Sequence, residues 1–160
     1  MLDPTIPLKI VSSYSHVDKE YLSKFDKFWQ PLRAESAVVS WTDRGILAGQ
    51  VWDDLIKKAF QEADVYLFLL SADALASEYI NTVEIKIATE RSATGAGAII
   101  PIIVRPCLWQ YTAFKNLQAL PSGGKAISTW ANEDEALQDV AGGLIQRLID
   151  IQQQRKAQGG

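Results

Sequence analysis

A run of six apolar residues, Val65-Tyr-Leu-Phe-Leu-Leu70, constrains the fold of this chain more than any other feature. A β-strand turns alternate side chains to opposite faces, so a strand without polar positions must be covered on both faces. Such strands occur inside parallel sheets that carry helices on both sides. The run is also far shorter than the roughly 20 residues that a membrane-spanning helix needs. It therefore predicts the central strand of an α/β domain.

Four further runs rich in strand-forming residues alternate with amphipathic stretches that have helical spacing. The runs cover residues 8–13, 37–41, 98–104 and 126–129, and helices are expected at about 18–33, from about 51, at 74–92 and at 133–153. This alternation predicts a five-stranded parallel sheet with right-handed crossovers and helices on both faces. Pro101 has no amide hydrogen, which disfavours a central place in the sheet at that position. Ligands of such sheets bind beyond the carboxyl ends of the strands, so function is expected in the segments that follow the strands.

The composition excludes several classes of function. The 160 residues carry a net charge of −3, which argues against a nucleic-acid partner because a phosphate-binding surface needs clustered Lys and Arg. Cys107 and His16 are the only cysteine and histidine, so the chain can form neither a Cys/His zinc site nor an internal disulfide. The N-terminus lacks the basic start and apolar run of a signal peptide. We therefore expect a cytoplasmic protein with no membrane partner, no metal and no bound cofactor.

Glu84 is the acidic residue whose surroundings are hardest to explain by solvent exposure alone. In a helix over 74–92, Ile80, Val83 and Ile87 mark the buried stripe, and Glu84 lies on its flank, about 65° from the centre. The residues one helical turn away include no cation: Ile80, Asn81, Ile87 and Ala88. A carboxylate beside an apolar stripe without a local cation is a candidate for a raised pKa or a ligand contact.

Aromatic residues recur near the carboxyl ends of the predicted strands: Tyr14, Trp41, Trp52, Tyr79 and Trp109. Such residues commonly fill the core or its rim, and they also offer stacking surfaces to a flat aromatic ligand. A loop over residues 42–49 lies between two of them and contains two glycines, which permit backbone geometry that other residues resist.

Taken together and in order, several segments resemble a bacterial Toll/interleukin-1 receptor (TIR) domain, from about Lys9 to Asp150. The segments are Val11-Ser-Ser-Tyr-Ser-His-Val-Asp18; Trp41-Thr-Asp-Arg-Gly-Ile-Leu-Ala-Gly-Gln-Val-Trp52, which is similar to the BB loop of the family; Ala63 to Ser71; Ser77-Glu-Tyr-Ile-Asn-Thr-Val-Glu84 with Ala88-Thr-Glu-Arg91; Ile100-Pro-Ile-Ile-Val-Arg-Pro-Cys-Leu-Trp109; and Leu117 to Pro121 before Gly124-Lys125. The chain departs from the family pattern at two positions. Many relatives have a bulky hydrophobic residue at the position of Ser12, and some have an aromatic residue at that of Ile80.

The resemblance implies a flavodoxin-like three-layer sandwich whose five-stranded sheet has the order 2-1-3-4-5. It also implies cleavage of NAD at the nicotinamide–ribosyl bond, with Glu84 as the catalytic residue and NAD as the substrate. The NAD-binding residues carried over by motif are Ser13, Tyr14, Asp43, Arg44, Trp52, Ser77 and Trp109. The BB-loop residues implied in self-association are Asp43, Arg44, Gly45, Ile46, Leu47 and Gly49.

We expect an effector of bacterial antiphage immunity that is activated by self-association and releases nicotinamide with ADP-ribose or a cyclic ADP-ribose isomer. Residues 1–8 are expected to be an N-terminal extension, 9–151 the TIR domain, and 152–160 a polar tail, either a frayed helix end or a linker to a C-terminal sensor module. Two alternatives stay open: a non-catalytic scaffold that acts by TIR–TIR assembly, and an enzyme similar to nucleoside deoxyribosyltransferases with a glutamate nucleophile.

Overall fold

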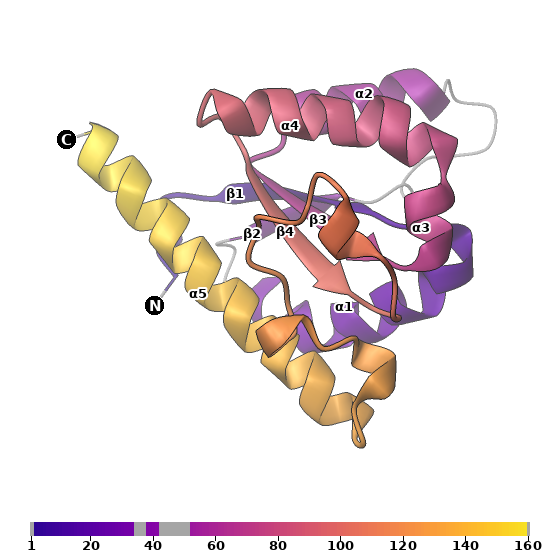
Figure 1. Ribbon diagram of the computed structural model, residues 1–160. Helices are drawn as coiled ribbons and strands as arrows, with labels where there is room; N and C mark the ends of the chain where they lie inside the picture. The colour runs from indigo at the N-terminus through magenta and orange to yellow at the C-terminus, as the bar shows by residue number, and fades with distance from the viewer. Residues whose placement is uncertain (1, 34–37, 42–51, 160) are drawn as a thin grey trace.

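The computed structural model describes residues 2–33, 38–41 and 52–159, and their strands form one parallel sheet (Figure 1). The strands are β1 (Leu8–Ser13), β2 (Val38–Trp41), β3 (Val65–Leu70) and β4 (Ala98–Ile103). Their order is β2-β1-β3-β4, and every neighbouring pair is parallel. β3 lies between β1 and β4 and all six of its residues are buried. The apolar run, predicted as the central strand, is therefore one of the two inner strands of the described sheet, beside β1.

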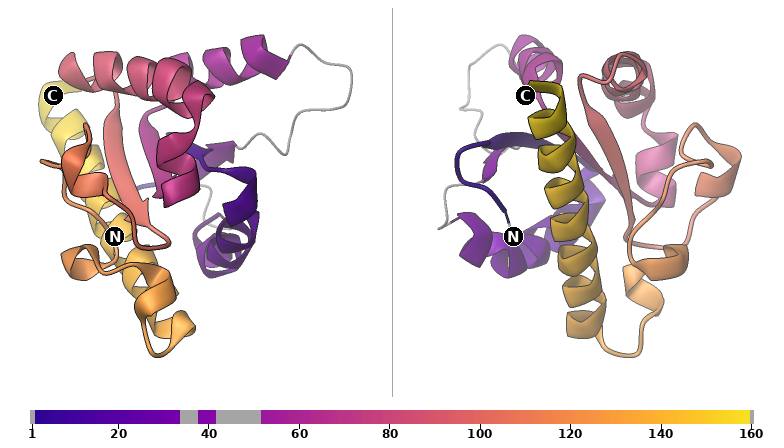
Figure 2. Two further views of the ribbon diagram at one scale, coloured as in Figure 1. Left: turned by 45° about the vertical axis from the view of Figure 1, so that its right-hand side comes forward. Right: turned by 90° about the vertical axis from the view of Figure 1, so that its left-hand side faces the viewer.

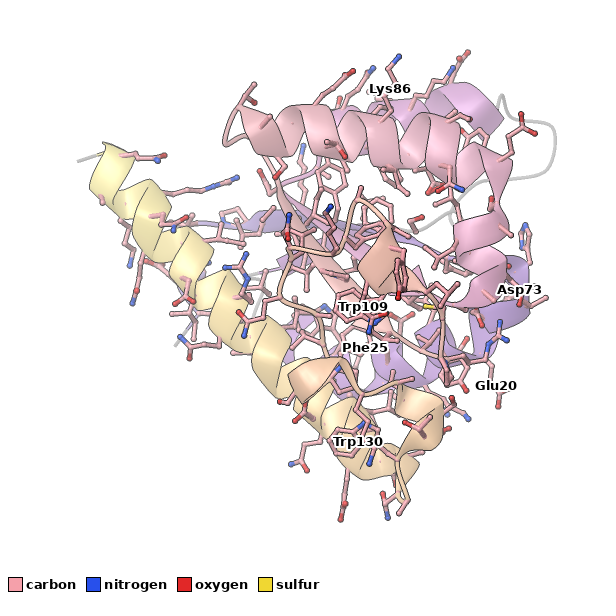
Figure 3. The ribbon with its side chains drawn as sticks, viewed as in Figure 1. Glu20, Phe25, Asp73, Lys86, Trp109 and Trp130 are labelled. Atoms are coloured by element: carbon pink, nitrogen blue, oxygen red, sulfur yellow. The ribbon has the colours of Figure 1, made fainter. Side chains whose placement is uncertain are left out.

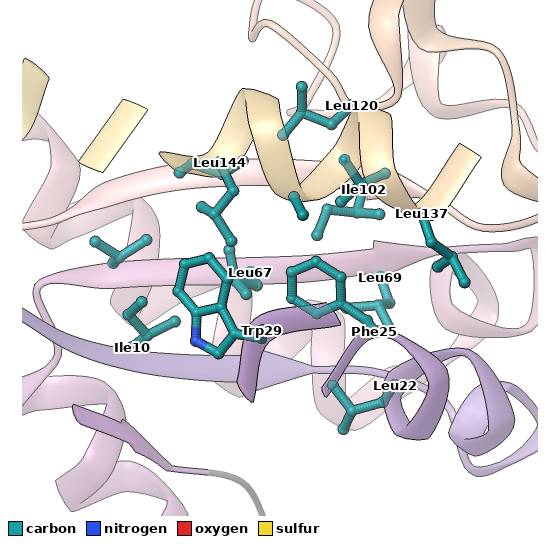
Figure 4. Close-up of a cluster of buried hydrophobic side chains, with 14 of the residues drawn as sticks. Ile10, Leu22, Phe25, Trp29, Leu67, Leu69, Ile102, Leu120, Leu137 and Leu144 are labelled. Atoms are coloured by element: carbon teal, nitrogen blue, oxygen red, sulfur yellow. The ribbon is translucent and has the colours of Figure 1, made fainter. Parts of the chain in front are cut away.

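Helices cover both faces of this sheet, which gives three layers (Figures 1 and 2). α1 (Lys19–Arg33) and α5 (Glu133–Gly159) pack on one face, and α2 (Trp52–Glu62), α3 (Ala72–Ala76) and α4 (Ile85–Ala93) pack on the other. Between the sheet and the first pair of helices lies a core that includes Phe25 and Trp29, whose stacked rings have centroids 5.8 Å apart (Figure 4). The core of the other face is built around Phe60, Phe68 and Phe114.

The structure corrects the prediction of a fifth strand at residues 126–129. Within the described residues the sheet has four strands, and Ile127–Thr129 forms a 3₁₀ turn. The carbonyl of Ala126 accepts hydrogen bonds from the amide of Thr129 at 2.9 Å and from its hydroxyl at 2.7 Å. These local bonds compete with sheet pairing, although Ala126 and Ile127 are buried as a strand would require. Among the described residues β4 is thus an edge strand, as Pro101 predicts, and one isolated bridge, from Ile102 to Leu120, lies beyond it.

The single helix predicted over 74–92 is broken into shorter pieces. α3 begins at Ala72, and the Ser71 hydroxyl caps it by accepting a hydrogen bond from the Ala74 amide at 3.2 Å. Ser77 ends α3 and starts the next helical segment, because its amide donates to the carbonyl of Ala74 and its hydroxyl accepts from the amide of Ile80 at 3.3 Å. A π-helical turn, Ile80–Glu84, then leads into α4. Regular helical spacing, from which a single helix over 74–92 was predicted, does not show this break.

The polar C-terminal stretch continues α5 as helix through Gly159 and does not end near residue 153. Gln152 is buried there, and its amide group accepts a hydrogen bond from the Asp3 amide and donates to the carbonyls of Asp3 and Ile6. Lys156 forms an ion pair with the Asp3 carboxylate, 2.6 Å between Nζ and Oδ2. The N-terminal segment is therefore held against the end of α5.

Candidate active site

A cavity of about 210 Å³ lies beyond the carboxyl end of β1, where the α/β pattern predicts function. One wall comes from the end of β1 and the turn that follows it, and another comes from the segment between α3 and α4. Residues of α2 complete the lining. The lining residues are Ser12, Tyr14, Ser15, His16, Ile56, Phe60, Ser77, Tyr79, Ile80 and Glu84.

The π-helical turn explains how Glu84 reaches this cavity. The amide of Ile85 donates to the carbonyl of Ile80, five residues back, so this turn holds one residue more than an α-helical turn. In an uninterrupted α-helix a residue four positions on lies about 40° past the first, and the wider turn reduces this offset. The buried face accordingly contains Ile80, Glu84 and Ala88, which are 6%, 8% and 0% exposed.

This face differs from the stripe that regular α-helical spacing predicts. Val83 and Ile87, which the spacing assigned to the core, are only half-buried. Glu84, which it assigned to a flank, is buried. The expectation that Glu84 has unusual surroundings for a helical glutamate is therefore strengthened, since its carboxylate lines a cavity in the protein.

The chemistry of the described lining is simple. Glu84 contributes the carboxylate, and His16 is the one lining residue among those described that could carry a positive charge. The others offer hydroxyl groups, aromatic rings or aliphatic carbon. A carboxylate beside hydroxyls and apolar surface can bind sugar hydroxyls and stabilise a cationic centre next to it.

The structure brings some of the expected NAD-binding residues together and separates others. Tyr14 and Ser77 line the cavity with Glu84. Ser13 is next to Tyr14 in sequence but is buried, and its hydroxyl forms no hydrogen bond with another described residue. Trp52 is the first residue of α2, and its side chain lies outside the described part of the structure. Asp43 and Arg44, with BB-loop residues Gly45, Ile46, Leu47 and Gly49, fall outside the described residues altogether.

Trp109 lies in a different cavity. Its ring borders a groove of about 510 Å³ between the segment after β4 and α5, together with Gly124 and Arg147 (Figure 3 labels Trp109). A Cβ atom on Gly124 would come within 2.8 Å of this ring, so glycine at that position permits the close packing. The family motif implies that Trp109 binds NAD together with Glu84, but in this chain the two residues line different cavities.

Several lining residues were not among the expected binding residues. Ser15 and His16 directly follow β1, and Tyr79 belongs to the aromatic group near the strand ends, so their place in the sequence was a usable signal. Ser12 and Ile80 are the two positions at which the chain departs from the family pattern, and both line the cavity with Glu84. A serine at position 12 leaves more room there than a bulky hydrophobic side chain would.

Other reactive groups in the described residues offer less for catalysis. Burial raises the pKa of the Cys107 thiol, so less of the thiolate nucleophile forms at neutral pH. No cluster of three or more His, Cys, Asp or Glu side chains that could hold a metal occurs in the part of the chain that is described. Likewise, none of the described helices has the length and apolarity required to cross a bilayer.

The fold and this cavity define a parallel α/β domain with a buried carboxylate beyond the carboxyl ends of its strands. A family model described as the TIR domain matches residues 10–140, and the chain belongs to this family. It is 37% identical over 129 residues to y4lF, an uncharacterized protein of Sinorhizobium fredii, and this match covers 81% of the chain and 40% of the relative. The chain thus spans less than half the length of that relative. The TIR family includes members that cleave NAD, and TIR domains commonly self-associate.

Proposed function

We propose that this domain cleaves the nicotinamide–ribosyl bond of NAD and that Glu84 is its catalytic residue. The observation that carries the proposal is the position of the Glu84 carboxylate, buried on the π-helical turn and lining a cavity at the carboxyl edge of the sheet. Membership of a family with NAD-cleaving members supports it.

One carboxylate is sufficient for this reaction. Glycoside hydrolases normally need a general acid because their leaving oxygen must be protonated, and they need a second carboxylate for the sugar. In NAD the nicotinamide ring is a cationic pyridinium, so the C–N bond breaks with both electrons going to nitrogen and nicotinamide leaves as a neutral molecule. The positive charge then develops on the ribose, where the Glu84 carboxylate stabilises it.

The cavity suits the reacting end of NAD. Its volume of about 210 Å³ is smaller than the roughly 300–1,000 Å³ of sites that enclose a drug-sized ligand, so we assign nicotinamide and its ribose to it and not the whole dinucleotide. Ile80 provides an aliphatic surface four residues before Glu84, where some relatives carry an aromatic one. Among the aromatic residues of the described lining, Phe60 is buried in the core, whereas Tyr14 and Tyr79 are half-buried and can flank the nicotinamide ring.

The second half of the reaction decides the product. Attack of water on the ribose carbon, with loss of its proton, gives ADP-ribose. Attack by an adenine nitrogen or a ribose hydroxyl of the same molecule gives a cyclic ADP-ribose isomer. We propose that the domain acts in bacterial antiphage immunity and is switched on by self-association, through BB-loop residues 43–49.

The test is product analysis of NAD incubated with the wild-type chain and with Glu84→Ala, at high protein concentration so that assembly can occur. We expect the wild type to release nicotinamide together with ADP-ribose or a cyclic isomer, and the variant to release neither. Tyr79→Phe is a suitable companion variant, because it keeps the ring that we assign to nicotinamide and should retain measurable turnover.

The alternatives give different results. A scaffold would leave NAD intact in the wild type, and its assembly would depend on the BB-loop residues but not on Glu84. An enzyme similar to nucleoside deoxyribosyltransferases would turn over deoxynucleosides but not NAD. Nicotinamide release that continues unchanged in Glu84→Ala would contradict the assignment of the catalytic residue.

A further inference from the structure

Asp18 is a fully buried carboxylate that joins three segments following the ends of three strands. It ends the 3₁₀ turn after β1 and is 0% exposed. Its Oδ1 accepts a hydrogen bond from Nε of Arg105, which follows β4, at 2.8 Å. Its Oδ2 accepts a hydrogen bond from the hydroxyl of Ser71, which follows β3. The carboxylate thus connects parts of the chain that are 53 and 87 residues distant in sequence.

Arg105 extends this network to α3. Its Nη2 donates to Oδ2 of Asp73 at 2.6 Å, while its Nε remains on Asp18. The planar guanidinium therefore holds two carboxylates in a fixed relative position, which the single ammonium group of a lysine cannot do in the same way. Figure 3 labels Asp73 on α3, at the edge of the molecule.

Both walls of the active-site cavity begin at this network, which we call the Asp18 network and define as Asp18, Ser71, Asp73 and Arg105. Ser15 and His16, from one wall, lie in the turn that Asp18 closes, where the Asp18 amide donates to the Ser15 carbonyl at 2.8 Å. The other wall starts at Ser77, the residue that follows α3, and α3 is capped by Ser71.

We propose that Asp18 and Arg105 are positioning residues that fix the distance between these two walls and so set Glu84 relative to the bound ribose. The proposal rests on the proposed function for its activity readout. Neither residue lines the described cavity, so each acts through the segments that it joins. A misplacement of about 1 Å can lower a rate by about 100-fold, so a network of this kind can control turnover without touching the substrate.

A matched control exists at the opposite end of the sheet. Arg155 has the same side-chain exposure as Arg105, 35%, and its Nη2 pairs with Oδ1 of Asp64 at 2.8 Å. Neither Arg155 nor Asp64 lines the cavity that contains Glu84. Loss of this second pair removes an arginine–aspartate contact without altering the walls of the active site.

The experiment compares Arg105→Ala, Arg105→Lys and Arg155→Ala with the wild type. Nicotinamide release from NAD gives kcat and KM, normalised to the folded fraction, and hydrogen exchange gives the protection of the amides in 14–18 and 71–81. We expect Arg105→Ala to lower kcat by about 10- to 100-fold and to speed exchange in both segments. Arg105→Lys should recover part of kcat, and Arg155→Ala should change neither kcat nor exchange in these segments.

Three outcomes would overturn the inference. They are an Arg105→Ala kcat equal to that of Arg155→Ala, an effect confined to KM, and unchanged exchange at 14–18 and 71–81. If the wild type does not cleave NAD at all, the proposed function fails, and hydrogen exchange alone then decides whether the Asp18 network holds the two walls. Should Arg105→Ala not fold, the double variant Asp18→Asn/Arg105→Lys, which removes the buried charge, takes its place under the same criteria.

Discussion

The two ends of the sheet bury polar groups for different purposes. At the amino end, the Gln152 amide bonds to the backbone of Asp3 and Ile6, and Asp64 bonds to both the Lys9 amide and Arg155. At the carboxyl end, Glu84 is also buried, at 8% exposed, and it lines the cavity of about 210 Å³. A cavity of about 150 Å³ also exists at the amino end, yet its Asp64 and Arg155 pair with each other. At the amino end the polar groups thus join segments of the fold to one another, whereas at the carboxyl end we propose that the buried carboxylate faces a substrate.

The strongest test of this comparison is Glu84→Gln, which keeps the size and loses the charge. We expect nicotinamide release to fall by about 100-fold or more, because the developing positive charge on the ribose loses its stabilising group. The variant should remain folded in circular dichroism and thermal unfolding. Activity close to that of the wild type would remove the functional distinction between the two ends.

The reciprocal change is Gln152→Leu at the amino end. It leaves the Asp3 amide and the Ile6 carbonyl without their Gln152 partner, while the Asp3 carbonyl keeps its bond from the Ile6 amide at 3.2 Å, so we expect the free energy of unfolding to fall by about 1–3 kcal/mol. Urea unfolding measures this loss, and Gln153→Ala, at the exposed neighbouring position, is the control. NAD cleavage per folded molecule should not change. A specific loss of turnover would show that the amino end also serves the site.

A smaller change in the free energy of unfolding is expected from substituting the two adjacent glycines of α5, Gly142 and Gly143. A Cβ atom at Gly143 would come 2.5 Å from Cδ2 of Leu120, whereas one at Gly142 meets nothing within 4 Å. We therefore expect Gly143→Ala to lower the free energy of unfolding by about 1 kcal/mol. Gly142→Ala should raise it by about 0.5–1 kcal/mol because alanine favours the helix. Equal effects in urea unfolding would contradict the close packing of Leu120 on α5.

The smallest expected effect is a pH dependence of the amino end. Hydrogen bonds from Lys156 and Thr5 lower the pKa of the Asp3 carboxyl below its ordinary value of 3.8. A carboxyl whose pKa is lowered in the folded state stabilises the fold above its unfolded pKa, and this contribution is lost as the pH falls below that value. Wild type and Asp3→Asn, compared by urea unfolding at neutral pH and at pH about 3, should differ more at neutral pH. A difference that does not depend on pH would contradict this account.

Much of the fold could be predicted from the sequence because the burial of a strand inside a parallel sheet appears in its pattern of apolar residues. β1 and β3 have the predicted bounds, and the inner place of β3 follows from its lack of polar residues. The fifth strand was predicted wrongly, because Ala126 and Ile127 would be buried in a strand as they are in the turn, and the local hydrogen bonds of Thr129 favour the turn.

The site was predicted in part, for a related reason. Glu84 could be singled out because no cation lies one helical turn away, but its burial depends on a π-helical turn that regular spacing does not show. Trp109 was assigned by motif to the same site, and its packing against Gly124 places it elsewhere. The roles of Ser15, His16 and Tyr79 depend on which segments meet in space, and spacing along the chain does not determine that.

The π-helical turn also has a consequence for how the gene can vary. Since the turn holds one residue more than an α-helical turn, an in-frame loss of a single codon within 80–83 would allow an ordinary α-helix to form there. Such a deletion would preserve the helix while turning Glu84 away from its present neighbours. The number of residues in this segment is therefore constrained, whereas a surface loop of the same size tolerates insertions and deletions.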